Sequence, residues 1–163
     1  IYTRVLKGHI AVASYKLNKN SCGDKIDQSA RKFLKDVNLD YPHGTGHGVG
    51  YFSNVHEGPQ AISRGNKVKF KEGMITSNEP GCYKRDHFGI RIENLVYVKK
   101  SKDKLMFEDL TLVPIDKKLI DEKLLTISEK NWLNKYHQKV FNNLKKFMNG
   151  SELIQLKQAC SNI

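Results

Sequence analysis

The chain has 163 residues, 39% of them hydrophobic, and a formal net charge of +11. This length allows one domain with a buried core, and no stretch is long and apolar enough to span a membrane. A positive charge of this size is typical of proteins that bind nucleic acids. The lysines, however, are scattered among acids and asparagines and form no basic stripe interleaved with aromatic residues. We therefore expect neither a membrane nor a nucleic acid as a partner.

The cysteines Cys22, Cys82 and Cys160 show no CxxC spacing, and their number is odd. Without a secretory signal, this pattern is typical of reduced thiols in a reducing compartment. We expect the three cysteines to be buried filler and the protein to be cytoplasmic.

The first part of the chain reads as helix. After an opening helical stretch, Ser21 is predicted as an N-cap, and apolar residues recur at helical spacing as far as Val37. A glycine-rich loop with two histidines follows at residues 43–47. Its glycines predict positive φ angles and a close approach of substrate to the main chain; they are Gly44, Gly46, Gly48 and Gly50.

Residues 68–115 have a β pattern. A short strand at residues 73–78 ends at Glu79, where Pro80 before Gly81 predicts a turn that leaves the carboxylate at a strand tip. Residues 88–98 begin with period-two alternation, which places Arg91 and Glu93 on one face of a strand. Either glutamate alone would be most simply a solvated charge. The histidine loop upstream favours a functional interpretation instead.

Helix returns after the β region. Thr126 and Glu129 have the spacing of a capping box. An apolar stripe then ends near Gly150 and consists of Trp132, Leu133, Tyr136, Val140, Leu144 and Phe147. We interpret this stripe as a packing surface or a subunit contact.

Four motifs in a fixed order make the chain recognisable. They are residues 43–50, 54–59, 78–81 and 89–94. Together they resemble aminopeptidase P, the Xaa-Pro aminopeptidases among the pita-bread metallopeptidases, and most closely the cytosolic eukaryotic form. The resemblance implies an α+β fold in which helices pack on a mainly antiparallel curved sheet. Residues 1–115 would be the C-terminal part of the pita-bread domain, and residues 116–163 a C-terminal helical extension.

The resemblance also implies a metal site. The family holds two divalent ions, usually manganese, with two aspartates, one histidine and two glutamates. Matched motif to motif, His47, Glu79 and Glu93 are the implied ligands, and Glu93 would bridge both ions. Zinc and cobalt also suit such nitrogen and oxygen ligands. The two aspartates have no counterpart here, so we expect a missing upstream half of the catalytic domain to carry them and the isolated chain to be inactive.

Other residues of the motifs have implied roles near the metals. His43 and His56 resemble family histidines that line the substrate pocket and take part in catalysis; loop histidines bonded to backbone are the structural alternative. Arg91 resembles a residue that orients a metal-ligating aspartate. Tyr83 would either line the pocket or pack on its strand.

The implied function is hydrolysis of the N-terminal Xaa-Pro bond by a metal-activated water. Glu79 would shuttle the proton. The substrates would be peptides with proline at the second position, and the full protein would be a homodimer. The alternative is a non-catalytic pita-bread protein that binds a protein or nucleic-acid partner. Joint retention of His47, Glu79 and Glu93 favours the enzyme.

Overall fold

The computed structural model describes residues 1–52 and 54–163. The chain divides into two compact units, residues 3–111 and residues 112–163, with Ile1 grouped with the first and Tyr2 with the second. The predicted boundary after residue 115 lies close to this division.

The first unit combines helices with antiparallel strands. The strands pair as β1-β2, β3-β6-β7 and β4-β5, all antiparallel. This arrangement confirms the predicted fold class. The elements of the unit are α1 (Tyr2–Ala13), α2 (Gly23–Lys35), β1 (Gly46–His47), β2 (Ala61–Ile62), β3 (Ile75–Asn78), β4 (Gly81–Lys84), β5 (Phe88–Arg91), β6 (Asn94–Ser101) and β7 (Lys104–Asp109).

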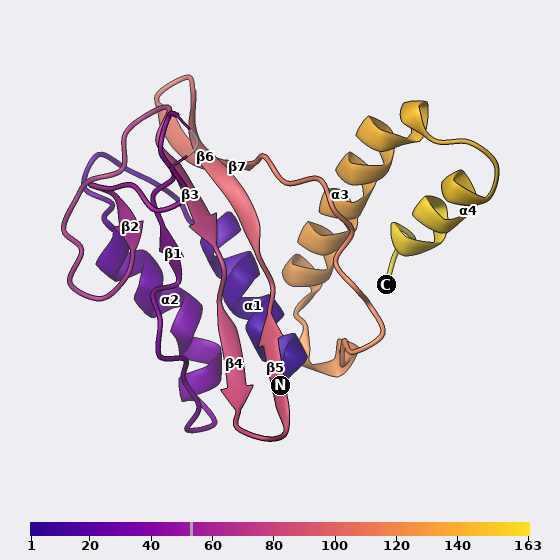
Figure 1. Ribbon diagram of the computed structural model, residues 1–163, viewed down its shortest axis with the longest axis horizontal. Coiled ribbons are helices and arrows are strands. Elements are labelled where there is room, and N and C mark those ends of the chain that lie inside the picture. Colours follow the sequence, from indigo (N-terminus) through magenta and orange to yellow (C-terminus); the bar gives the residue numbers. More distant parts are fainter. Residues whose placement is uncertain (53) are drawn as a thin grey trace. The chain divides into compact units, whose positions relative to one another are not determined.

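The core of this unit lies between its helices and its strands. Helices α1 and α2 lie behind the strands in the view of Figure 1. The buried apolar cluster draws on both helices and on the sheet, and includes Val12, Ile26, Ala30, Ile62, Phe70, Val96, Val98 and Phe107. The two helices approach closely at Gly8, where a Cβ would stand 2.6 Å from the carbonyl oxygen of Ala30. The helices therefore form one layer that supports the strands.

One long hairpin carries both glutamates, and it is interrupted at them. Strands β3 and β6 pair as far as Asn78 opposite Asn94, and pairing resumes in β4 and β5 with Gly81 opposite Arg91. Pro80 has no N–H to donate to a ladder, and the amide of Ile92 donates to the Pro80 carbonyl at 3.3 Å. The single strand predicted at residues 88–98 is therefore two strands. The predicted turn after Glu79 is also wrong, because the chain continues into β4.

Two further expectations about element ends were wrong. The N-cap of α2 is Cys22, and the hydroxyl of Ser21 instead accepts from the amide of Asn18 at 3.0 Å. Strand β7 ends at Asp109, so the β structure does not extend to residue 115 as predicted. There the amides of Leu110 and Thr111 both bond the Leu95 carbonyl, at 2.9 and 3.3 Å.

The second unit is helical, which confirms the predicted C-terminal extension. It contains η1 (Glu122–Leu124), α3 (Ile127–Leu144), η2 (Lys145–Phe147) and α4 (Gly150–Ala159). The predicted capping box at Thr126 and Glu129 is present. The apolar stripe is buried at Leu133, Tyr136 and Val140. Among the described residues, no helix combines the length and the apolar character needed to cross a membrane.

Candidate metal centre

The two glutamates face one another across the interruption in the hairpin. Glu79 follows β3 directly and is 8% exposed, whereas Glu93 precedes β6 and is exposed. The ladder on either side fixes the two backbones, since Asn78 pairs with Asn94 and Gly81 with Arg91. Neither glutamate lies within a strand, so the alternation of side chains in a strand does not direct the two carboxylates to opposite faces. Both can therefore point toward the same site.

His47 is brought to the same place by β1. Its amide donates to the Ser77 hydroxyl at 2.9 Å, and its carbonyl accepts from the Thr76 hydroxyl at 2.9 Å. The approach of β1 to β3 requires glycine beside the histidine, because a Cβ on Gly46 would collide with the Ser77 carbonyl.

The loop glycines therefore act by allowing contact between main chains. The positive φ predicted for Gly44, Gly46, Gly48 and Gly50 is wrong: in the described part of the chain, the glycines with positive φ are Gly65, Gly73 and Gly150. A Cβ on Gly48 would collide with the carbonyl of Glu57, so close packing within the protein explains this glycine as well.

The three predicted ligands converge. One ligand atom from each of His47, Glu79 and Glu93 lies within 4.8 Å of the others. Nδ1 of His47 donates to the Gly48 carbonyl at 3.1 Å, which leaves Nε2 of the neutral imidazole as an acceptor. This nitrogen lies 3.3 Å from Oε1 of Glu79, and the same oxygen accepts from the Ser77 hydroxyl at 2.7 Å.

This donor set fits a divalent cation. An imidazole nitrogen and two carboxylates are ligands that suit manganese, cobalt or zinc. The Gly48 carbonyl accepts from His47 and the Ser77 hydroxyl donates to Glu79, so hydrogen bonds orient both side chains, as is usual around metal sites.

A second group of predicted residues adjoins the ligands. Nε2 of His43 and Nε of Arg91 both lie 2.9 Å from the Tyr83 hydroxyl. Nδ1 of His43 donates to the Gly44 carbonyl at 2.7 Å, so Tyr83 donates to His43 while it accepts from Arg91. The hydrogen bond with Tyr83 raises the pKa of Arg91. Nη1 of Arg91 lies 3.6 Å from Oε2 of Glu79, which joins this group to the ligands.

His56 stands beside the histidine ligand. Its ring centroid lies 4.2 Å from that of His47, and the residue is exposed. All seven predicted site residues therefore belong to one neighbourhood. Their individual roles stay predictions.

The site also rests on residues that the sequence did not single out for function. His9 of α1 is fully buried, its Nδ1 lies 3.3 Å from the Ile92 carbonyl, and its own carbonyl accepts from the side-chain amide of Asn78 at 3.0 Å. Burial lowers the pKa of His9 to about 4. One neutral histidine thus contacts the Ile92 backbone beside Glu93 and the Asn78 side chain beside Glu79.

Comparison with known proteins identifies the family. Residues 1–100 match the model of metallopeptidase family M24, and residues 103–163 match the C-terminal region of peptidase M24. The chain belongs to metallopeptidase family M24. This confirms the family resemblance drawn from the four motifs.

Named relatives are consistent with this assignment. The chain is 48% identical over 165 residues to a probable Xaa-Pro aminopeptidase P of Botryotinia fuckeliana, covering 93% of the chain and 25% of that protein. It is 46% identical over 160 residues to aminopeptidase P2 of Arabidopsis thaliana, covering 92% and 22%. The chain thus spans about a quarter of the length of the curated relatives it matches.

Solved structures agree. The X-prolyl aminopeptidase of Caenorhabditis elegans, described as a cytosolic enzyme with a di-nuclear active site, matches with a TM-score of 0.91 at 39% identity, over 99% of this chain and 28% of that one. The prolidase of Pyrococcus furiosus matches with a TM-score of 0.60 at 30% identity, over 68% and 31%.

Proposed function

We propose that this chain forms part of the active site of a metal-dependent Xaa-Pro aminopeptidase. The observation that carries the proposal is the convergence of His47, Glu79 and Glu93, whose ligand atoms lie within 4.8 Å of one another. A di-nuclear active site is described for the similar C. elegans enzyme, which supports two ions here. Manganese is proposed as the native metal. Two aspartates from outside residues 1–163 would complete the ligand set.

The bound ions would lower the pKa of a shared water and polarise the scissile carbonyl. His47 and Glu79 would hold one ion, and Glu93 would contact both. Glu79 is suited to move a proton from the attacking water to the departing proline nitrogen, because it is a buried carboxylate at the ligand cluster.

The remaining residues would position the substrate. His43 and His56 flank the ligands and can donate to or accept from a bound peptide. Arg91 would orient one of the outside aspartates with its planar guanidinium. Tyr83 would hold His43 and Arg91 in their places. Substrates would be peptides with proline at the second position, as the names of the relatives indicate.

The proposal extends to the setting of the enzyme. The cytosolic location of the C. elegans enzyme supports the cytosol for this one. The complete protein would be a homodimer.

The test is hydrolysis by the complete protein that contains residues 1–163. It should release the N-terminal residue from an Xaa-Pro peptide, leave the matched Xaa-Ala peptide intact, lose activity in EDTA and regain it with Mn²⁺. Release that persists after the metal has been removed would contradict a metal-dependent mechanism, and loss of the proline preference would contradict the substrate.

A further inference from the structure

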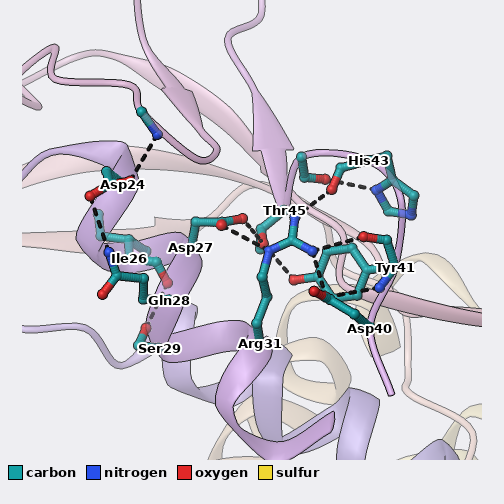
Figure 2. A network of polar contacts seen from close by, with 12 residues as sticks. Asp24, Ile26, Asp27, Gln28, Ser29, Arg31, Asp40, Tyr41, His43 and Thr45 are labelled. Carbon is teal, nitrogen blue, oxygen red and sulfur yellow. Dashed lines mark hydrogen bonds and ion pairs between the residues drawn. The ribbon is translucent and has the colours of Figure 1, made fainter. Parts of the chain in front are cut away.

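A buried arginine on α2 holds the loop that carries the site histidines. Arg31 donates from Nε to Asp27 at 2.8 Å, from Nη1 to Asp40 at 2.6 Å and the Tyr41 carbonyl at 2.8 Å, and from Nη2 to the His43 carbonyl at 2.5 Å. Figure 2 shows these bonds fanning out from one guanidinium. Two of the four acceptors are main-chain carbonyls of the loop. Arg31 therefore fixes the backbone of the loop in addition to pairing with carboxylates.

The environment keeps this guanidinium in one geometry. The Arg31 side chain is 11% exposed and that of Asp27 is 3% exposed. Burial opposes the charge of Arg31, but hydrogen bonds to Asp27 and Asp40 outweigh burial and raise its pKa. The guanidinium also lies over the ring of Tyr41, 4.0 Å from its centroid. The planar guanidinium of Arg31 offers several donors to these acceptors, whereas the ammonium group of a lysine could bind only some of them.

Arg31 is one of four residues that form a closed ring of hydrogen bonds. The Thr45 hydroxyl donates to Oδ1 of Asp27 at 2.6 Å. It therefore accepts from the Tyr41 hydroxyl, which lies 2.5 Å away. Asp27, Arg31, Tyr41 and Thr45 thus bind one another, and both ends of the segment from Tyr41 to Thr45 are attached to α2 (Figure 2).

Two paths lead from this ring to the site. The Thr45 carbonyl accepts from the amide of Glu79 at 2.8 Å, which connects the ring to a predicted ligand. The His43 carbonyl is bound by Arg31, while the His43 side chain accepts from Tyr83 at 2.9 Å. A shift of the loop would therefore move His43 and Glu79 together.

We propose that Arg31 is a positioning residue for catalysis, which sets the place of His43 and Glu79 through the backbone of residues 41–45. The proposal rests on the function proposed above. It adds a residue with no contact to the ligand cluster, whose effect passes through the hydrogen bonds that it makes to the loop.

The test is Arg31→Lys in the complete protein, with Arg4→Lys as the matched control. Arg4 also donates to a main-chain carbonyl, that of Phe33 at 2.9 Å, but it does so on α2 and away from the loop. Arg31→Lys should lower kcat for an Xaa-Pro peptide by about 10- to 100-fold with little change in KM, because a small misplacement of catalytic groups costs this much. Hydrogen exchange of residues 43–47 should become faster. Arg4→Lys should change neither.

A milder variant covers the case in which Arg31→Lys does not fold. Tyr41→Phe keeps the aromatic side chain under the guanidinium and removes only the hydroxyl that bonds Thr45. It should lower kcat and speed the hydrogen exchange of Thr45, both to a smaller degree than Arg31→Lys does. If Arg31→Lys folds and its kcat and exchange equal those of Arg4→Lys, Arg31 has no positioning role. If Arg31→Lys does not fold, the same equality for Tyr41→Phe overturns the proposal.

The measurements separate this proposal from the proposed function. If the wild-type protein does not cleave Xaa-Pro peptides, the proposed function fails, and unchanged exchange of residues 43–47 in Arg31→Lys then overturns the hold on the loop. If the wild type is active and Arg31→Lys keeps its kcat, only the positioning proposal is overturned.

Discussion

Nε2 of His47 and Oε1 of Glu79 lie 3.3 Å apart, although one residue comes from β1 and the other follows β3. Nδ1 of His47 donates to the Gly48 carbonyl, so Nε2 of the neutral ring is an acceptor that faces another acceptor. Such a pair repels unless a proton or a metal ion lies between the two atoms. A divalent cation between the two atoms would satisfy both, and an oxygen of Glu93 adds a third donor.

The approach of β1 to β3 should be sensitive to a single methyl group. Gly46→Ala would drive a Cβ into the Ser77 carbonyl, and overpacking of this kind costs about 1–3 kcal/mol. Because the same contact places His47 beside Glu79, we expect the variant to lose metal as well as stability. Elemental analysis of the purified complete protein and its melting temperature measure the two effects.

Gly65→Ala is the control for Gly46→Ala. Gly65 has a φ of +78°, and a Cβ added there would meet no described atom within 4 Å, so alanine at this position costs about 1 kcal/mol of backbone strain. It should lower the melting temperature and keep the metal. Equal metal loss in both variants would mean that the loss follows from instability alone.

The Tyr83 hydroxyl should matter for turnover more than for stability. Tyr83→Phe removes the hydroxyl that bonds both His43 and Arg91, and loss of such a supporting partner costs about 10- to 100-fold in activity. The residue is 40% exposed, so its fold contribution is small. Steady-state kinetics and thermal melts should separate the effects, with Tyr97→Phe on β6 as the control. A kcat equal to that of Tyr97→Phe would show that the hydrogen bonds of the Tyr83 hydroxyl do not contribute to turnover.

Local patterns predicted the parts of the structure that depend on neighbours in sequence. The capping box at Thr126 and Glu129 has a fixed spacing that specifies its hydrogen bonds. The alternation around Arg91 and Glu93 correctly predicted strand-like backbone, but it could not show the break at Ile92, because that residue lies opposite Pro80, between β3 and β4.

The candidate site likewise has parts that local sequence patterns predict and parts that depend on residues distant in sequence. Motif matching selected the three predicted ligands and the four candidate residues near them, since all seven lie within short recognisable stretches. The i,i+4 spacing of Asp27 and Arg31 could have indicated an ion pair on a helix. The bond from Thr45 to Asp27 joins residues 18 apart in sequence, and periodicity carries no information about such a contact.

Stability should fall in acid because of a buried histidine in the second unit. Burial, with the nearby charge of Lys117, lowers the pKa of His137 to about 4, and the Ile115 amide donates to its Nε2 at 3.1 Å. The unfolded chain therefore takes up this proton first as the pH falls. The contribution of His137 is complete above about pH 6.5 and declines by about 1.4 kcal/mol per pH unit from there to about pH 4.

His137→Gln isolates this effect, because glutamine can still accept from Ile115 and does not titrate. Denaturant unfolding of the complete protein at pH 6.5 and pH 5.0 should show a wild-type loss that exceeds the loss of the variant by about 2 kcal/mol. His9 titrates in both proteins and cancels in the difference. Parallel losses in the two proteins would show that His137 is not the neutral group described here.

The most direct measurement is the metal content of two variants of the complete protein, Glu93→Ala and His56→Ala. Glu93 offers an oxygen within 4.8 Å of the other two ligand atoms, whereas the His56 ring lies 4.2 Å from that of His47 without belonging to the cluster. The wild type should hold two divalent ions per chain, Glu93→Ala should lose them, and His56→Ala should keep them while its turnover falls. Two ions retained in Glu93→Ala would contradict the assignment of His47, Glu79 and Glu93 as the metal centre.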